Sequence, residues 1–436
     1  MKVLHLNYTD TGGGAAIAAL NLVVEQNKKN IQAKLGVINN KTTSPLVFSA
    51  LKKRNLFFKL ISEIATGLKF ILIYIKFYDS NSPFFFFKTS NPILHSKNSQ
   101  TLIDVNWIND SDFDLVHLHW INFDMISIKD IAKIKKPIIW TMHDTWPFCG
   151  AEHYPNVLEN DDRYTIGYYR YNKPKSTKGI DLCRNVWNKK KKYLQKKDIV
   201  FISPSTWERD CLKQSKLFSE KECFVIPNIV PKNVFKPFDK LTIRKLLNIP
   251  SDKKVLGFGA AYDIDNPKGI KGSYYLLQLL QNQSLPDDYF LVIFGSISPS
   301  FSSKITVPFF SSGFISNPYI MAQLYNACDC FICPSLIENL PTTCLESICC
   351  GVPVTAFNVG GTKDIIEHKV NGYLATPYDV EDLKTGVDYC ISNYRELSEN
   401  CLRKAEKDFD NTIIVQKHIE VYESILSKRT SRNDLE

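Results

Sequence analysis

Two glutamates, Glu338 and Glu346, have seven residues between them, and their types and spacing could hold an elongated ligand. Glu338 follows an apolar, strand-like run at 330–333, and Glu346 falls within an amphipathic helical pattern at 342–350. At about 1.5 Å of rise per helical residue, the two carboxyl groups should lie on the order of 10 Å apart. That is too far for a retaining glycosidase pair, which needs about 5 Å. The free N–H groups at the start of the helix can seat a phosphate, so the pattern suggests a nucleotide-sugar.

The elements that must position these acids form a strand, a loop, a helix and a second strand. Pro341 suits the first position of the helix because its missing N–H would be unpaired there anyway. Gly351 can take the left-handed conformation that closes a helix, and the proline two residues later prevents its continuation. An apolar strand at 352–357 follows and ends at Gly360 and Gly361.

These residues resemble the donor-binding signature of the retaining family 4 glycosyltransferases. The match consists of the two acids, the Gly-Val-Pro-Val sequence at 351–354 and the double glycine. The resemblance implies an α/β protein with the GT-B fold, in which two doubly wound Rossmann-like domains face each other across a cleft. It also implies that Glu338 lies by the donor sugar and that Glu346 bonds the ribose hydroxyls. The alternative is an ordinary βαβ unit with two surface acids, which the added strand and glycines disfavour.

The same resemblance implies a lysine that neutralises the donor diphosphate at the entry of a helix. Lys271 has the better phase with the leucines that follow, and Lys268 remains the rival. Ala260 stands where many members have an arginine, which makes the lysine more important. The glycine loop after the first strand (3–7) lacks the third glycine of the dinucleotide fingerprint, so alone it is a weak signal. Further residues are predicted on the donor side, in the glycine loop, near the base and between the two acids. They are Gly12, Gly13, Gly14, Gly313, Ile315, Asn339 and Leu340.

Two further strands, at 113–119 and 137–142, end in His and Trp at the edge where parallel sheets bind ligands. The resemblance makes His119 the best match to a histidine at the sugar and the acceptor, with His117 as the alternative on the same strand face. The following His-Asp-Thr-Trp-Pro-Phe segment is similar to that of polysaccharide-type members. It adds His143 and Asp144 as acceptor-side, catalytic candidates.

A metal bound by His117, His119 and His143 is disfavoured, since the only carboxylates close in sequence to the pair of His117 and His119 are Asp114 and Asp124. We therefore expect no metal and no other cofactor, because the nucleotide-sugar is a substrate.

The chain of 436 residues is long enough for two or three domains, and its 44% hydrophobic content excludes wholesale disorder. We predict an acceptor-side domain at 1–230 and a nucleotide-sugar domain at 231–412, joined by a proline-containing linker at 227–237. A final helix, at 413–436, should cross back to the first domain.

Twelve cysteines lie mostly in apolar segments, which favours buried free thiols and a reducing compartment. Cys330 and Cys333 could form half of a zinc site, but no second pair has metal-ligand spacing. The N-terminus lacks the continuous apolar region of a signal peptide, so we expect a cytoplasmic protein.

The formal net charge is +9, with clusters such as 189–192, yet no nucleic-acid motif accompanies them. The segment 51–88 is apolar and basic, but its charges leave no uncharged stretch of about 20 residues that could span a bilayer. Either an amphipathic helix on the inner face of the plasma membrane or a buried insertion fits it. The segment 156–197 suggests an acceptor-facing insertion followed by a basic helix.

The predicted reaction is transfer of a sugar from a nucleotide-sugar to a hydroxyl of a glycan or lipid-linked glycan, with retention of configuration. The predicted partners are this donor, the saccharide acceptor and an anionic membrane, without nucleic acid. A sugar-nucleotide epimerase on the same fold and a non-catalytic GT-B partner subunit remain alternatives.

Overall fold

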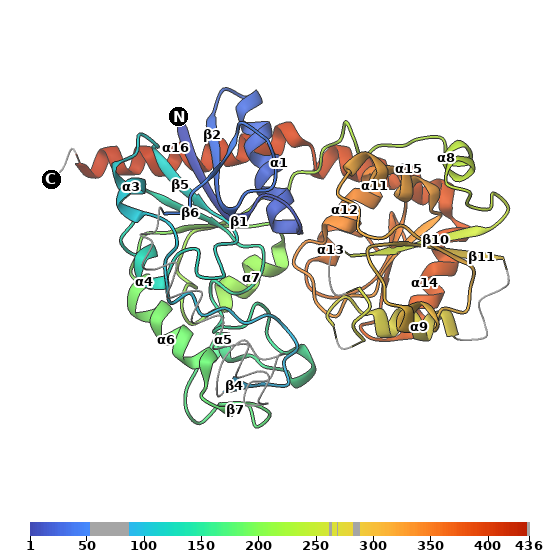
Figure 1. The fold of residues 1–436 in the computed structure, drawn as a ribbon, viewed down its shortest axis with the longest axis horizontal. Coiled ribbons are helices and arrows are strands. Elements are labelled where there is room, and N and C mark those ends of the chain that lie inside the picture. Colours follow the sequence, from blue (N-terminus) through green and yellow to red (C-terminus); the bar gives the residue numbers. More distant parts are fainter. Residues whose placement is uncertain (53–86, 261–263, 268, 282–287, 434–436) are drawn as a thin grey trace.

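The computed structural model describes residues 1–52, 87–260, 264–267, 269–281 and 288–433. Figure 1 shows two α/β lobes side by side, each built around its own sheet. This confirms the predicted pair of doubly wound domains. Most of the segment 51–88, with its two interpretations, lies outside the described residues.

The sheet of the first lobe is parallel, with strand order β3-β2-β1-β5-β6-β8-β9 across the described residues. Its central strands are apolar without alternation because helices cover both faces. The strand bounds are β1 (Lys2–Thr9), β2 (Gln32–Asn39), β3 (Val47–Ser49), β5 (Leu115–Leu118), β6 (Ile138–Thr141), β8 (Val200–Ser203) and β9 (Cys223–Val225).

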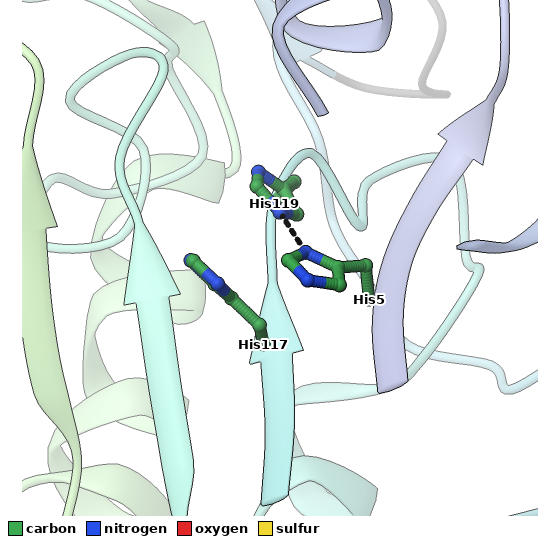
Figure 2. Close-up of side chains that lie close together, drawn as sticks. All are labelled: His5, His117 and His119. Atoms are coloured by element: carbon green, nitrogen blue, oxygen red, sulfur yellow. Dashed lines mark hydrogen bonds between the residues drawn. The ribbon is translucent and has the colours of Figure 1, made fainter. Parts of the chain in front are cut away.

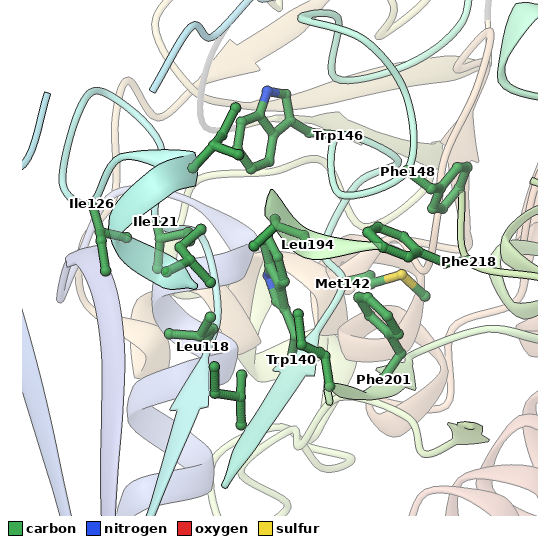
Figure 3. Packing of buried hydrophobic residues seen from close by; sticks show 14 of the residues in the cluster. Leu118, Ile121, Ile126, Trp140, Met142, Trp146, Phe148, Leu194, Phe201 and Phe218 are labelled. Atoms are coloured by element: carbon green, nitrogen blue, oxygen red, sulfur yellow. The ribbon is translucent and has the colours of Figure 1, made fainter. Parts of the chain in front are cut away.

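Helices of the first lobe pack on this sheet and enclose a core rich in aromatic residues (Figure 3). Trp140, Phe201 and Phe218 are fully buried there, and Leu194, the last residue of the helix at Leu182–Leu194, belongs to the same cluster. The helix bounds are α1 (Gly14–Lys28), α3 (Val105–Asp110), α4 (Ile128–Ile131), the 3₁₀ helix η1 (Val157–Glu159), α5 (Arg163–Ile166), α6 (Leu182–Leu194) and α7 (Thr206–Gln214). Within the region predicted as an insertion, β7 (Lys178–Gly179) pairs antiparallel with β4 (Phe87–Lys88).

The sheet of the second lobe is also parallel, in the order β12-β11-β10-β13-β14-β15 across the described residues. Its strands are β10 (Lys254–Gly259), β11 (Tyr289–Phe294), β12 (Phe309–Ser311), β13 (Cys330–Cys333), β14 (Val354–Phe357) and β15 (Gly372–Ala375). Its helices are α8 (Lys240–Leu246), α9 (Ser273–Gln281), α10 (Pro299–Ser302), α11 (Pro318–Ala327), α12 (Thr342–Cys349), α13 (Thr362–Ile365), α14 (Val380–Ser392) and α15 (Tyr394–Asp408).

The last helix, α16 (Asn411–Asn433), leaves the second lobe after α15 and runs along the first (Figure 1). Ile414, Val415 and Tyr422 pack in the same buried cluster as α1 and the strands of the first sheet. The helix therefore contributes to the core of the domain in which the chain begins.

The structure confirms one expectation from composition and changes another. All twelve cysteines are free thiols, and all but the half-buried Cys223 are buried. Lys190, in the middle of a predicted basic cluster, is fully buried, and its ammonium donates to the carbonyl oxygens of Trp146, Cys149 and Gly150. None of the helices in the described part of the chain is both long and apolar enough to cross a membrane.

Candidate active site

The loop that carries Glu338 lies at the carboxyl end of β13, between this strand and α12. The helix begins at Thr342, so Pro341 occupies the N-cap position, one residue before the place predicted for it. A proline fits either position, since it has no N–H to leave unsatisfied. Gly351 has the predicted left-handed backbone, with φ 73°. The predicted strand–loop–helix–strand order is confirmed.

Glu338 is buried at this edge, and its carboxylate binds a lysine. Oε1 accepts hydrogen bonds from Nζ of Lys271 at 2.7 Å and from Oγ of Ser335 at 2.9 Å. Burial alone would lower the pKa of Lys271, but the charge and hydrogen bond of Glu338 raise it above its usual range. The lysine is therefore a cation held beside the acid. Its rival, Lys268, lies outside the described residues.

Gly272 explains how Lys271 reaches this position. Its φ is +71°, and a Cβ added to it would lie 1.7 Å from the carbonyl oxygen of Pro334. Because only glycine allows this contact, the start of α9 lies directly against the loop after β13. The Lys-Gly pair thus brings the ammonium to the loop of Glu338.

The double glycine holds the same loop from the other side. A Cβ on Gly360, at φ +56°, would lie 1.9 Å from the carbonyl oxygen of Glu338. A Cβ on Gly361 would lie 1.8 Å from that of Asn339, and its own N–H donates to the Glu338 carbonyl at 2.9 Å. The glycines are therefore needed for close backbone contact with the segment that carries the acid.

Glu346 is buried on α12 and contacts the neighbouring helix α11. Its Oε2 accepts a hydrogen bond from the hydroxyl of Tyr325 at 2.9 Å. Burial raises the pKa of Glu346 to about 7, although the bond from Tyr325 acts in the opposite direction. The carboxyl group therefore changes charge near neutral pH.

This pKa predicts a pH-dependent stability change in Glu346→Gln. Burying the ionised carboxylate costs free energy that is absent below the unfolded value of 4.5 and complete above about pH 7. The amide should therefore raise the free energy of unfolding at pH 8, by at most about 3 kcal/mol, and change it little at pH 4.5. Urea denaturation at both pH values measures the difference. Glu406→Gln, at an exposed position of α15, is the matched control, and an equal effect of Glu346→Gln at both pH values would contradict the assignment.

The glycine loop of the first lobe faces the start of α12. A Cβ on Gly14 would lie 3.2 Å from Oγ1 of Thr342, the first residue of that helix. Gly12 has φ +80°, and Gly13 is the N-cap of α1. The beginnings of two helices, one from each lobe, thus lie close to this loop, and the N–H groups at such ends favour anions.

His119 belongs to a buried chain of hydrogen bonds, and Figure 2 shows the bond between His119 and His5. His5 donates through Nε2 to Oε1 of Gln26 at 2.8 Å, so its Nδ1 must accept from Nε2 of His119 at 2.9 Å. Nδ1 of His119 then accepts from Nε2 of His143 at 3.0 Å. Burial lowers the pKa of His119 well below its usual value, with His5 and His143 adding to the effect. His119 is therefore a neutral imidazole with a fixed tautomer.

The chain of hydrogen bonds continues from Gln26 to α16. The Gln26 amide donates to the hydroxyl of Tyr422 at 2.8 Å, and that hydroxyl lies 2.7 Å from Nδ1 of His117. His117 is bonded in turn to Thr141 through Nε2 at 2.7 Å. His117 thus bonds the last helix and β6, whereas His119 bonds His143.

The predictions did not include His5, Gln26 or Tyr422 in the site. The strand register pairs His5 of β1 with His117 of β5. The sequence alone does not indicate this register, and this is why His5 was not placed beside the other histidines. Ring nitrogens of His5, His117 and His119 lie close enough to share a metal ion, but all six ring nitrogens already have hydrogen-bond partners. The arrangement favours an imidazole network.

Asp144 is buried and holds its surroundings in place. Its Oδ1 accepts from the N–H of Trp146 at 2.9 Å, and Oδ2 accepts from Nε1 of Trp120 at 2.9 Å and Nδ1 of His153 at 2.5 Å. Burial opposes ionisation, but His153 and the other donors lower the pKa of Asp144 below its usual value. The Asp144 carboxylate is thus a fixed hydrogen-bond acceptor. The neighbouring His143 side chain is half-buried and lines a small pocket together with His119, Thr141 and His418.

The structure places Asn339 at the contact between the two lobes. Its Oδ1 accepts from Oγ of Ser205 at 2.6 Å, and its Nδ2 donates to Glu208 at 2.6 Å and to the carbonyl of Met142 at 3.1 Å. These bonds fasten the loop next to Glu338 to the strand end that carries His143. Leu340 is buried in the core of the second lobe.

Gly313 and Ile315 follow β12, at the exit of the second sheet. The carbonyl of Gly313 accepts from the N–H of Gly295, at the end of β11, at 2.9 Å. Gly313 has φ +66° and space around its Cα, whereas Ile315 packs against the core. A backbone hydrogen bond thus ties Gly313 to the end of β11.

Comparison with known proteins agrees with this geometry. Residues 239–408 match the family model of glycosyl transferases group 1. Among solved structures, Anabaena HepE in complex with UDP-glucose is similar with a TM-score of 0.62 and 18% identity, and the match covers 97% of this chain and 100% of that chain. WaaG, a glycosyltransferase involved in lipopolysaccharide biosynthesis, is similar with a TM-score of 0.60 and 14% identity, and the match covers 96% of this chain and 99% of that chain. The protein therefore has the GT-B fold, and the match to the glycosyl transferases group 1 model lies within its second lobe.

Curated relatives match over shorter stretches. An uncharacterized glycosyltransferase of Haemophilus influenzae is 28% identical over 223 residues, which cover 49% of this chain and 58% of the relative. A D-inositol 3-phosphate glycosyltransferase of Stackebrandtia nassauensis is 27% identical over 180 residues, 39% of this chain and 41% of the relative. The chain thus spans about half the length of the curated relatives it matches.

Proposed function

We propose that this protein transfers a sugar from a nucleoside diphosphate sugar to a hydroxyl group of a glycan or lipid-linked glycan. The observation that carries the proposal is the Lys271–Glu338 ion pair, in which a half-buried ammonium meets the buried carboxylate on the loop that precedes α12. A half-buried cation beside a carboxylate fits a ligand in which a phosphate adjoins a sugar. The family model covers both residues, and HepE, which has the same fold, has been solved in complex with UDP-glucose.

In the proposed complex, Lys271 and the N–H groups at the start of α12 stabilise the diphosphate as it leaves. Negative charge develops there during transfer, and fixed donors in a partly buried site stabilise it more than water does. Glu338 orients the sugar hydroxyls and supports positive charge at the ring, while Glu346 binds the ribose. Backbone groups at 313–315 hold the base. Because protein groups supply the positive charge, we propose that the transfer step needs no metal.

His119 aligns the acceptor or the sugar hydroxyl in this proposal, because it is neutral and held by two other imidazoles. His143 is the more exposed of the linked histidines and approaches the acceptor first. The family 4 resemblance supports attack from the face of the departing phosphate, with retention of configuration. We also propose a cytoplasmic site of action with contact to an anionic membrane, which would suit a lipid-linked acceptor.

Ligand-induced stabilisation tests the proposal. A ligand that binds only the native state raises the melting temperature, so we expect a shift with one nucleotide class and a larger one with its sugar conjugate. Nucleoside diphosphate should then be released when a saccharide acceptor is added. Failure of UDP-, GDP- and ADP-sugars alike to shift the melting temperature would contradict the proposal. Conversion of the donor sugar without any acceptor would identify an epimerase.

A further inference from the structure

His95, Glu152 and Cys183 form a buried cluster in the first lobe for which the proposed transfer has no use. Their potential ligand atoms all lie within 4.8 Å of one another. The three residues come from segments far apart in the sequence: the chain before α3, the loop after β6 and the start of α6. Imidazole, carboxylate and thiolate are all ligands that Zn²⁺ accepts.

Glu152 supplies an independent sign that the cluster has a ligand. The residue is 1% exposed, and its Oε1 accepts from the hydroxyl of Tyr168 and from the N–H of Gly150. Within the part of the chain that the structure describes, Oε2 is buried and has no hydrogen-bond partner. Leaving a buried carboxylate oxygen unpaired costs free energy. A cation at Oε2 would remove this cost.

The orphaned oxygen points toward the cysteine. A Cβ added to Gly150 would lie 2.6 Å from Oε2 of Glu152 and 2.7 Å from Cα of Cys183, so glycine is needed for the two to approach. Cys183 is the second residue of α6, and burial together with the charge of Glu152 raises the pKa of its thiol well above the usual value. The carboxylate and the sulfur therefore lie on one side of the same small space.

His95 has the tautomer that a ligand needs. Its Nδ1 donates to the carbonyl of Ile93 at 2.7 Å, so Nε2 carries the lone pair. A histidine that binds a metal through one nitrogen commonly donates its other N–H to a carbonyl in this way. His95 also forms a β-bridge with Glu152, which fixes the two backbones next to each other.

We propose that His95, Glu152 and Cys183 bind a Zn²⁺ ion that ties together the three segments they come from, with one position of the tetrahedral ion left for a further ligand. Magnesium and calcium prefer sites made of oxygen ligands alone, and the mixed set favours zinc. On binding, the Cys183 thiol loses its proton to solvent and its sulfur bonds to the metal. The ion has no part in sugar transfer, but it stabilises the loop that runs from Asp144 to Glu152.

Metal analysis of the full-length protein tests the site. After incubation with Zn²⁺ and gel filtration, we expect about one zinc per chain. With Co²⁺ instead, an absorption band from thiolate-to-cobalt charge transfer should appear. Both signals should be lost in Cys183→Ser and retained in Cys211→Ser, which alters another buried cysteine of the same lobe.

A second variant and a chelator keep the test decisive if Cys183→Ser does not fold. Glu152→Gln should lower the zinc content by at least tenfold, and a zinc chelator should lower the melting temperature of the wild-type protein. Absence of zinc from the zinc-treated wild-type protein would overturn the proposal. So would the wild-type zinc content in folded Cys183→Ser or Glu152→Gln.

Discussion

Lys271→Ala should lower kcat/KM for the nucleotide-sugar by about 10²- to 10³-fold, as removal of a preorganised electrostatic group does in other active sites. The substitution removes the cation that binds Glu338 at 2.7 Å and that we place at the donor diphosphate. Among the described residues, it also leaves the buried carboxylate with the hydrogen bond from Ser335 and without a neighbouring cation. Both changes place excess negative charge where the phosphates would lie. Steady-state kinetics with varied donor concentration measures the loss.

A double variant separates the two causes of this loss. Glu338→Gln alone should impair transfer, because it removes the carboxylate that we place at the sugar. In Lys271→Ala/Glu338→Gln, the unpaired charge is gone but the cation is still missing. If Lys271 acts on the diphosphate, the double variant stays as inactive as Lys271→Ala. Recovery of activity would mean that the lysine serves only to neutralise Glu338. Lys271→Arg, which keeps the charge, should retain part of the rate.

Gly360→Ala should destabilise the second lobe by about 3–5 kcal/mol, the range reached when a substitution strains the backbone and creates a clash. The added methyl would lie 1.9 Å from the carbonyl oxygen of Glu338, so either the loop or β14 and the residues after it must move. Movement of the loop would displace Glu338 and abolish donor binding as well. Urea denaturation gives the free energy, and the thermal shift with donor gives the binding.

Gly313→Ala is the matched control for stability. Gly313 has a similar φ of +66°, but a Cβ there would have nothing within 4 Å among the described residues. It should therefore show only the cost of the left-handed backbone, about 1–2 kcal/mol. Equal losses in the two variants would show that the contact with Glu338 contributes nothing beyond backbone strain.

Much of the second lobe was predictable because its signals are local. Strand, turn and helix follow one another from 330 to 361, and each is marked by nearby residues, such as the apolar run at 330–333 and Gly351 with its left-handed backbone. The phase of Lys271 with the leucines of α9 likewise comes from a single helix. The error at Pro341 was one residue, since a proline fits both the N-cap and the first helical position.

Other contacts could not be predicted from one sequence. Lys190 belongs to a run of lysines, yet it alone of the four is buried, because the turn from Trp146 to Gly150 presents carbonyl groups to it. Asn339 was predicted on the donor side, and the structure shows its side chain bonded to the opposite lobe. Neither partner is near in sequence, so no spacing or periodicity indicates it.

The sequence by itself determined the two α/β lobes, the unit of β13, α12 and β14 in the second lobe, and the acids and glycines placed on that unit. These depend on interactions between residues a few positions apart, which leave a readable pattern. Only the tertiary structure decided that His5 joins His119, that Tyr422 on the last helix completes this network, and that Glu152 meets Cys183. Strand register and the docking of α16 create those contacts, and both arise from the packing of the whole chain.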